Sequence, residues 1–306
     1  MNPQAHVHHR ILHGEHRRDA VFALVGLLVM LVIMWVLAAL FVRLVVDGAG
    51  HLDLAFLLSY PSRHADQAGI LAAWVGSILV LLVTAFAAVP LGVAAGIYLE
   101  EYAQRGRWSS MLEVSIGNLA GVPSIVYGLL ALGLLVQGMH LGQSILSAGL
   151  TLAMLILPMV IVSTREALRS VSVDLREASL ALGASRWQTV WHHVLPQAMP
   201  GILTGVILGL SRAIGETAPV IVIGALSFLS FLPAAPISAT PPFVNLDWLY
   251  SPFTVLPIQV FHWISRPNPD FHANAAAAGV VLVVLNLAMN AVALFIRQRA
   301  RRRQFG

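Results

Sequence analysis

Two oppositely charged residues stand inside an otherwise apolar stretch of this sequence. Arg212 and Glu216 lie within residues 200–226, and their separation of four residues puts both side chains on one face of a helix, within reach of each other. The planar guanidinium of arginine carries a fork of N–H donors that matches two oxygens of an oxyanion. A neighbouring carboxylate can orient that fork and accept a proton from the anion. The pair predicts an oxyanion-binding position; the alternative is an ion pair that only compensates itself.

Hydroxyl groups are the other side chains that could line a path for such an anion. The candidates are Ser77, Ser124, Tyr127 and Thr217. For each of them the alternative is a hydroxyl that bonds its own helix or packs against a neighbouring one. Gly215 and Pro219 flank Glu216, so we expect the helix to be distorted there and to free backbone groups toward the path.

The amino-acid composition indicates whether this chain, with Arg212 and Glu216, lies in water or in a membrane. Of the 306 residues, 58% are hydrophobic and only 10% are charged, whereas a soluble protein carries about 25% charged residues. This deficit predicts an integral membrane protein, in which a charged side chain inside a span costs about 2.5 to 3.5 kcal/mol and faces a cavity or the protein interior. We therefore interpret Arg212 and Glu216 as part of a substrate pathway.

Two absences exclude whole classes of site. The sequence has no cysteine, which excludes disulfides, thiolate metal sites and cysteine nucleophiles. All 18 basic residues are arginine, and the P-loop that binds nucleotide phosphates requires a lysine. This chain is therefore not an ATPase of that type. We expect no catalytic residue, cofactor or metal.

Six stretches have the roughly 20 mainly apolar residues that a membrane-spanning helix requires. They are residues 20–43, 71–98, 116–137, 143–164, 200–226 and 274–296. Helices are expected because a backbone in lipid must satisfy its own hydrogen bonds, and the runs are too continuous for barrel strands. We predict an all-α polytopic membrane protein with a six-span domain over 20–296, whose first stretch is an uncleaved anchor and not a signal peptide.

The arginines are distributed unevenly between the two sides of this arrangement. Fourteen of the 18 fall in the first tail, the loop after the second stretch, residues 165–199 and the last tail. On the opposite side are only Arg43, Arg63 and Arg266. The positive-inside rule therefore predicts that both tails, 1–19 and 297–306, are cytoplasmic. It also explains the formal charge of +4 without a nucleic-acid partner.

Two segments outside the spans have a biased composition. Residues 227–273 hold eight of the 16 prolines and are expected to form a structured but irregular loop on the outer, periplasmic side. The first tail holds five histidines, which could bind a metal weakly. A disordered tail of biased composition is the interpretation we prefer.

The long inner segment, 165–199, has a different character. Apolar residues recur in it at helical spacing, and Gly183 permits a sharp change of direction between two short helices. One alternative is a basic amphipathic loop that lies on the membrane surface. The arrangement Glu177-Ala178-Ser179, Gly183 and Leu195-Pro196, however, resembles the EAA loop of ABC-importer permeases. This resemblance implies that residues 174–196 dock on a partner ATPase and couple it to the membrane.

Further motifs make the resemblance more specific. Residues 212–219, Arg-Ala-Ile-Gly-Glu-Thr-Ala-Pro, and 120–128, Ala-Gly-Val-Pro-Ser-Ile-Val-Tyr-Gly, are similar to signatures of the PstA and PstC type phosphate permeases. Residues 256–260, Leu-Pro-Ile-Gln-Val, resemble the PstA branch. Relatives carry arginine near position 162, where this chain has valine and places Arg165 three residues later.

The resemblance implies a complete assembly. It implies a type I ABC-importer permease fold in a bacterial inner membrane, where this chain pairs with a homologous PstC-like permease. Two PstB-like ATP-binding subunits and an extracytoplasmic PstS-like phosphate-binding protein complete the importer. Phosphate would pass Arg212, Glu216, Thr217, Ser124, Tyr127 and Ser77.

Three other functions remain as alternatives. A permease for sulfate, molybdate or another oxyanion would share the fold. Only the Arg212–Glu216 pair with its neighbouring residues distinguishes a phosphate permease from these. An intramembrane protease would need a catalytic pair at membrane depth, and the sequence has no His-Glu-x-x-His run. A membrane scaffold would not need charges at 212 and 216.

Overall fold

The computed structural model describes residues 3–104, 106–236, 243 and 245–302, and within them the all-α prediction is confirmed, since no strand is present. The main helices are α1 (Pro3–Gly48), α2 (Leu54–Leu58), α3 (Leu71–Ile97), α4 (Arg107–Ala120), α5 (Ser124–Ala131), α6 (Ile145–Arg169), α7 (Val173–Ala181), α8 (Arg186–Thr189), α9 (Leu195–Gly215), α10 (Ala218–Ile223), α11 (Leu256–Ile264) and α12 (Asp270–Arg302). The short 3₁₀ turns are η1 (Ala49–His51), η2 (Ala65–Gln67) and η6 (Asp247–Tyr250), and the π-helical turns are η3 (Tyr98–Tyr102), η4 (Leu132–Gly138) and η5 (Val190–Val194).

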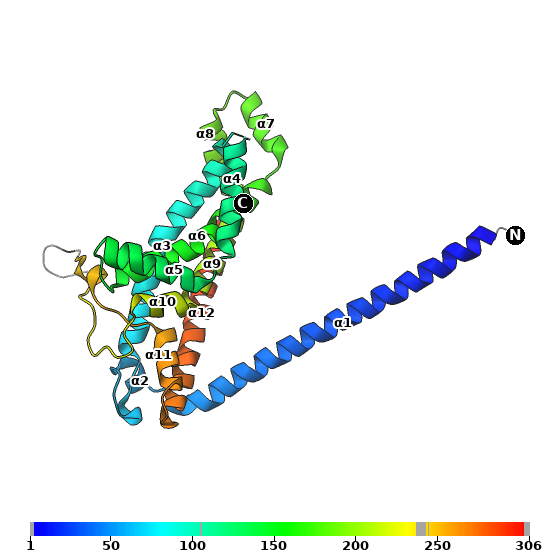
Figure 1. Cartoon of the computed structure of the whole chain (residues 1–306). Helices are drawn as coiled ribbons and strands as arrows, with labels where there is room; N and C mark the ends of the chain where they lie inside the picture. The colour runs from blue at the N-terminus through cyan, green and yellow to red at the C-terminus, as the bar shows by residue number, and fades with distance from the viewer. Residues whose placement is uncertain (1–2, 105, 237–242, 244, 303–306) are drawn as a thin grey trace.

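The helices form an elongated bundle with α6 at its centre. α6 makes its most extensive contacts with α3 and α9, and α12 packs on α9 and α11. In Figure 1, α7 and α8 lie at one end of the bundle, and α2 and the junction of α1 with α12 lie at the other. The core between α3 and α6 is apolar and contains Val80, Val83, Leu152 and Ile156.

Polar bonds add to the contact between α9 and α12. The hydroxyl of Ser211 donates to the side-chain oxygen of Asn290, and Arg297 donates to the hydroxyl of Thr204 at 3.0 Å. Hydrogen bonds of this kind join helices in lipid, where apolar contact alone gives little preference for protein over lipid.

The first helix differs from the others because it stands away from the bundle (Figure 1). The helix is continuous from Pro3 to Gly48, so the prediction of a disordered first tail is wrong for residues 3–19. Its membrane segment buries nothing against the rest of the chain. Only its last turns contact α12, as at Gly48, which lies against the backbone of Ala277.

Two of the six predicted spans are broken in the structure. Residues 116–137 do not form one helix, because α4 ends at Ala120 and α5 begins at Ser124, and the α4 and α5–η4 segments are bent by 102°. Pro123 has no N–H to continue the first helix. Residues 200–226 divide into α9 and α10 around Glu216, whose backbone is extended, as the flanking glycine and proline predicted. The described residues thus contain five helices able to cross a membrane, or six with the bent pair.

The segment predicted as an irregular outer loop, 227–273, is partly helical. It contains η6 and α11, and α12 begins within it at Asp270. Pro257 stands in the first turn of α11, where its missing N–H costs nothing. Trp263 of α11 is fully buried between Phe56 and Phe271, so this helix is part of the core. Residues 237–242 and 244 lie outside the described residues.

The contact between α3 and α6 depends on Gly149, and its replacement by alanine should destabilise the protein. A methyl group at this position would lie 2.5 Å from the Cβ and Cγ1 atoms of Val83. Overpacking of this kind costs about 1 to 3 kcal/mol. We expect thermal unfolding of the detergent-solubilised chain at a lower temperature for Gly149→Ala. Gly26→Ala is the control, because no atom lies within 4 Å of the added methyl; equal melting temperatures for both variants would contradict this account.

Candidate functional site

The Arg212–Glu216 pair forms as the spacing predicted. The Nε atom of Arg212 lies 3.3 Å from Oε1 of Glu216, and their side chains are 45% and 19% exposed. Arg212 is in the last turn of α9, where the helix dipole favours a positive charge. The guanidinium therefore lies on the surface of this chain and not inside its core. It is open to a ligand or to a second subunit.

The four hydroxyl candidates lie in different surroundings. The hydroxyl of Tyr127, a buried residue of α5, donates to the carbonyl oxygen of Leu119 at 2.9 Å and so holds α4 and α5 together across their break. Ser124 begins α5 and is half-buried. Thr217 precedes α10, and its side chain makes no capping hydrogen bond.

Ser77 has a structural contact that sequence reasoning did not predict. Its Oγ atom accepts a hydrogen bond of 2.8 Å from the backbone N–H of Leu256, which fixes the start of α11 on α3. Ser77 and Glu216 also line one small cavity of about 10 Å³, enough for a single water molecule. The structure thus brings Ser77 close to Glu216 but gives its hydroxyl a partner within the chain.

The segment that resembles an EAA loop forms a compact helical hairpin. Gly183 has a φ of +86°, which glycine adopts without steric cost, and this turn lets α8 fold back on α7. Ser185 then begins α8 with a reciprocal capping box to Gln188. The hydroxyls of Ser179 and Thr189 are buried and lie 2.9 Å apart, so they join the two helices.

The outer surface of this hairpin is apolar in several places. Leu182 is 89% exposed, and the rings of Trp187 and Trp191 are exposed and stacked at 5.3 Å. Glu177 and Ala178 are exposed as well, whereas Leu195 is buried at the start of α9 and Pro196 follows it in the first turn of that helix. An exposed apolar patch of this kind indicates a surface that a partner covers.

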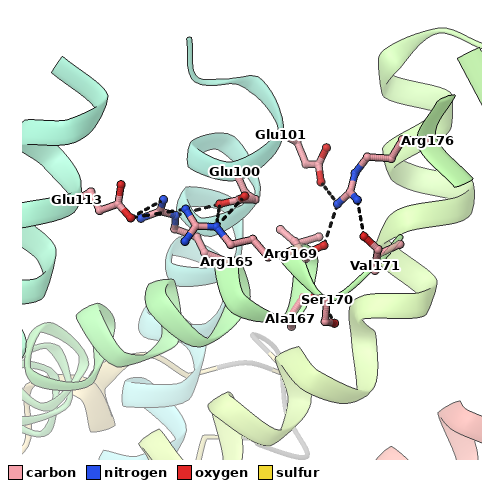
Figure 2. Close-up of polar contacts among 10 residues, drawn as sticks. Glu100, Glu101, Glu113, Arg165, Ala167, Arg169, Ser170, Val171 and Arg176 are labelled. Atoms are coloured by element: carbon pink, nitrogen blue, oxygen red, sulfur yellow. Dashed lines mark hydrogen bonds and ion pairs between the residues drawn. The ribbon is translucent and has the colours of Figure 1, made fainter. Parts of the chain in front are cut away.

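A second group of charged residues was missed in the sequence because its members lie at the ends of apolar stretches. Figure 2 shows Glu100, Glu101 and Glu113 facing three arginines from α6 and α7. The arginines are Arg165, Arg169 and Arg176. The side chain of Arg165 is only 9% exposed. The signal available in the sequence was Glu100-Glu101 directly after one apolar run and Arg165 directly after another.

Comparison with known proteins identifies the family. The model of the family described as "Binding-protein-dependent transport system inner membrane component" matches residues 88–302. This chain belongs to that family. It is a multi-pass inner-membrane permease of an ABC transporter that works with ATPase and binding-protein partners. The matched residues include the Arg212–Glu216 pair, the helical hairpin and the second charged group.

Individual relatives cover most of this permease. It is 33% identical to the probable ABC transporter permease protein YqgI of Bacillus subtilis (strain 168), over 85% of this chain and 88% of the relative. It is 35% identical to the phosphate transport system permease protein PstA 1 of Mycobacterium tuberculosis (strain ATCC 25618 / H37Rv), over 77% of this chain and 72% of the relative.

Solved structures confirm the fold of this permease. A chain of the MetNI methionine ABC transporter in an inward-facing conformation aligns with a TM-score of 0.56 at 18% identity, over 74% of this chain and 94% of that chain. A chain of a bacterial ABC transporter for alginate aligns with a TM-score of 0.54 at 12% identity, over 87% of this chain and 96% of that chain. These likenesses show that the bundle is an ABC-importer permease fold.

Replacement of Ser77 by alanine should lower the stability of this permease more than its transport activity. The change would leave the buried N–H of Leu256 without its acceptor, at a cost of about 1 to 3 kcal/mol. We expect a lower melting temperature for Ser77→Ala in detergent and little loss of uptake per folded molecule. Loss of uptake at unchanged stability would indicate instead that Ser77 belongs to the substrate pathway.

A disulfide between the two helices of the hairpin should leave transport intact if the hairpin moves as a rigid unit. Ser179→Cys with Thr189→Cys places two thiols where the hydroxyls are 2.9 Å apart, and the chain has no other cysteine. We expect oxidation to form an internal bridge, detected by electrophoresis, with ATP-driven uptake unchanged. Uptake that is lost on oxidation and restored by a reductant would show that the hairpin must flex.

Proposed function

We propose that this chain is one of the two membrane subunits of an importer for inorganic phosphate. The observation that carries the proposal is the surface-exposed Arg212 with Glu216 beside it at the break between α9 and α10. Relatives named as phosphate permeases at 31–35% identity support the choice of substrate. The partner permease would supply the opposite wall, so that phosphate passes between the two chains.

In this proposal Arg212 binds phosphate oxygens, and Glu216 discriminates phosphate from sulfate. A guanidinium fork fits two oxygens of phosphate. Phosphate keeps a proton at neutral pH and can donate a hydrogen bond to the Glu216 carboxylate, whereas sulfate has no such proton and is only repelled by that carboxylate. Rejection of a competitor through an unfavourable contact is an established source of specificity.

The coupling part of the proposal concerns the hairpin at 174–196. Its exposed apolar surface would dock on an ATP-binding subunit, with Glu177, Ala178, Ser179 and Gly183 shaping the contact and Leu195 and Pro196 joining it to α9. The sequence has no lysine for a P-loop of its own, so the partner would hydrolyse the ATP and this chain would perform no bond chemistry. The arginine distribution supports cytoplasmic placement of the hairpin and both tails.

The specific partners are a homologous PstC-like permease, two PstB-like ATPases and an extracytoplasmic PstS-like phosphate-binding protein. An importer for another oxyanion, such as sulfate or molybdate, is the alternative, because its permease would have the same fold and the same type of hairpin.

Replacement of Arg212 by glutamine should abolish phosphate import without preventing assembly. Each hydrogen bond to a charged group contributes about 1.5 to 3 kcal/mol, so we expect at least about a tenfold loss of ATP-dependent uptake of labelled phosphate. Arg43→Gln is the matched control, because Arg43 forms an i,i+4 ion pair with Asp47 that is 82% and 53% exposed. Unchanged uptake for Arg212→Gln would show that this arginine has a structural role and does not bind the substrate.

Replacement of Glu216 by glutamine should relax the discrimination against sulfate. The variant removes the negative charge that repels sulfate while it leaves an acceptor for the Arg212 fork. We expect excess sulfate to compete with labelled phosphate in the variant and not in the wild type. Full discrimination in Glu216→Gln would contradict the role of Glu216, and competition in the wild type would favour the broader oxyanion permease.

A further inference from the structure

Two adjacent glutamates in η3, the turn that continues α3, contact different helices of this permease. Glu101 forms an ion pair with Arg176 of the hairpin helix α7. Glu100 pairs with Arg165 and Arg169 of α6, and these two arginines also pair with Glu113 of α4 (Figure 2). We propose that this pair of glutamates is the link through which displacement of the hairpin reaches α3 and α4. The proposal rests on the coupling role given to the hairpin above, and it assigns that role to residues outside the hairpin motif.

The bond between Glu101 and Arg176 is the strongest element of the link. Nη2 of Arg176 lies 2.8 Å from Oε1 of Glu101, and the two side chains are only 21% and 8% exposed. The same guanidinium donates to the carbonyl oxygens of Leu168 at 2.8 Å and Val171 at 2.7 Å. It thus fastens α7 to the end of α6 and to η3 at once. Removing one partner of such a pair leaves the other charge buried and uncompensated.

Glu100 carries the connection from η3 to α6. Its carboxylate accepts from Nε of Arg165 at 3.3 Å and from Nε of Arg169 at 2.9 Å. η3 is the direct continuation of α3, so both glutamates belong to one short helical turn. A movement that α7 applies to Glu101 is therefore applied to the turn that also holds Glu100.

Glu113 extends the connection to α4. Its Oε1 atom lies 3.0 Å from Nη2 of Arg165 and 3.5 Å from Nη2 of Arg169. The pair with Arg169 is half exposed and contributes little, whereas Arg165 is buried. α4 buries none of its own residues, so this contact is among the few that fasten it to α6. Beyond the break, α4 leads to Ser124 and Tyr127 of the candidate pathway.

The balance of charges favours a mechanical role over a binding role for this group. Three glutamates face three arginines, so their charges cancel in pairs. The polar cavity of about 720 Å³ beside them is lined by members of the same group. Of the three arginines that line it, Arg165 and Arg169 are already engaged by carboxylates, and Arg186 lies over the ring of Tyr102. The arginines of the charged group are therefore poorly placed to bind an added anion.

The first test is a double-mutant cycle on Glu101→Gln and Arg176→Gln in the assembled importer in proteoliposomes. We expect each single variant to assemble with the ATPase and to transport about fivefold less phosphate per ATP hydrolysed, the scale of coupling between groups in contact. The double variant should be no worse than either single variant. Glu166→Gln, an exposed carboxylate of α6, is the control. Single variants with the wild-type ratio, or losses that multiply in the double variant, would overturn the proposal.

A second measurement separates this proposal from the identity of the substrate. Spin labels at Gly117→Cys on α4 and Leu287→Cys on α12 report their separation in a chain without other cysteines. We expect ATP to change this distance in the otherwise wild-type importer and to change it much less when Glu101→Gln is added. An equal change in both would overturn the link. A wild-type importer that shows the change but takes up no phosphate would refute the proposed substrate alone.

Discussion

The close packing of α3 against α6 is the constraint on which the rest of the structure depends. In lipid the hydrophobic effect gives no preference for a neighbouring helix over an acyl chain, so small residues that let backbones approach must provide the contact. Gly149 does so for α6 against Val83 of α3. α6 is more buried than the other candidate spans in the described residues, and α9, α5 and α4 all contact it. The candidate pathway and the hairpin are therefore both attached to this one helix.

The breaks between α9 and α10 and between α4 and α5 put polar side chains at positions that a continuous helix would not give them. α9 ends just before Glu216, and its last turn presents Arg212 on the surface of the chain. α5 begins after a sharp bend, and Tyr127 bonds back across it to Leu119. Non-helical backbone at membrane depth is tolerated where protein or a polar cavity satisfies its hydrogen bonds. Both breaks lie in the two sequence stretches that resemble phosphate permeases, and α5 packs against α10 in the structure.

The charged groups at the end of the bundle show how charge is kept near the apolar core. Arg165 is nearly buried, and the free-energy cost of burying its charge is offset by ion pairs with carboxylates from two other segments. Arg176 instead uses one carboxylate and three backbone carbonyls. Each arginine thus joins elements that are distant in the sequence, whereas the Arg212–Glu216 pair joins the last turn of α9 to the residue that follows it and leaves the guanidinium partly exposed. This difference separates charges that join distant parts of the fold from the exposed charge for which we propose a role in substrate binding.

The sequence by itself determined the helical class, five of the membrane helices, the distortion at Glu216 and the hairpin turn at Gly183. These follow from local rules: apolar length, the ion-pair spacing of four, and the backbone limits of glycine and proline. It could not determine the break of the third stretch into two bent helices, the helical first tail, the partner of Ser77 or the link from Glu101 to Arg176. Those features depend on contacts between residues far apart in the chain. A side chain's partner is decided only when packing brings its helix beside another.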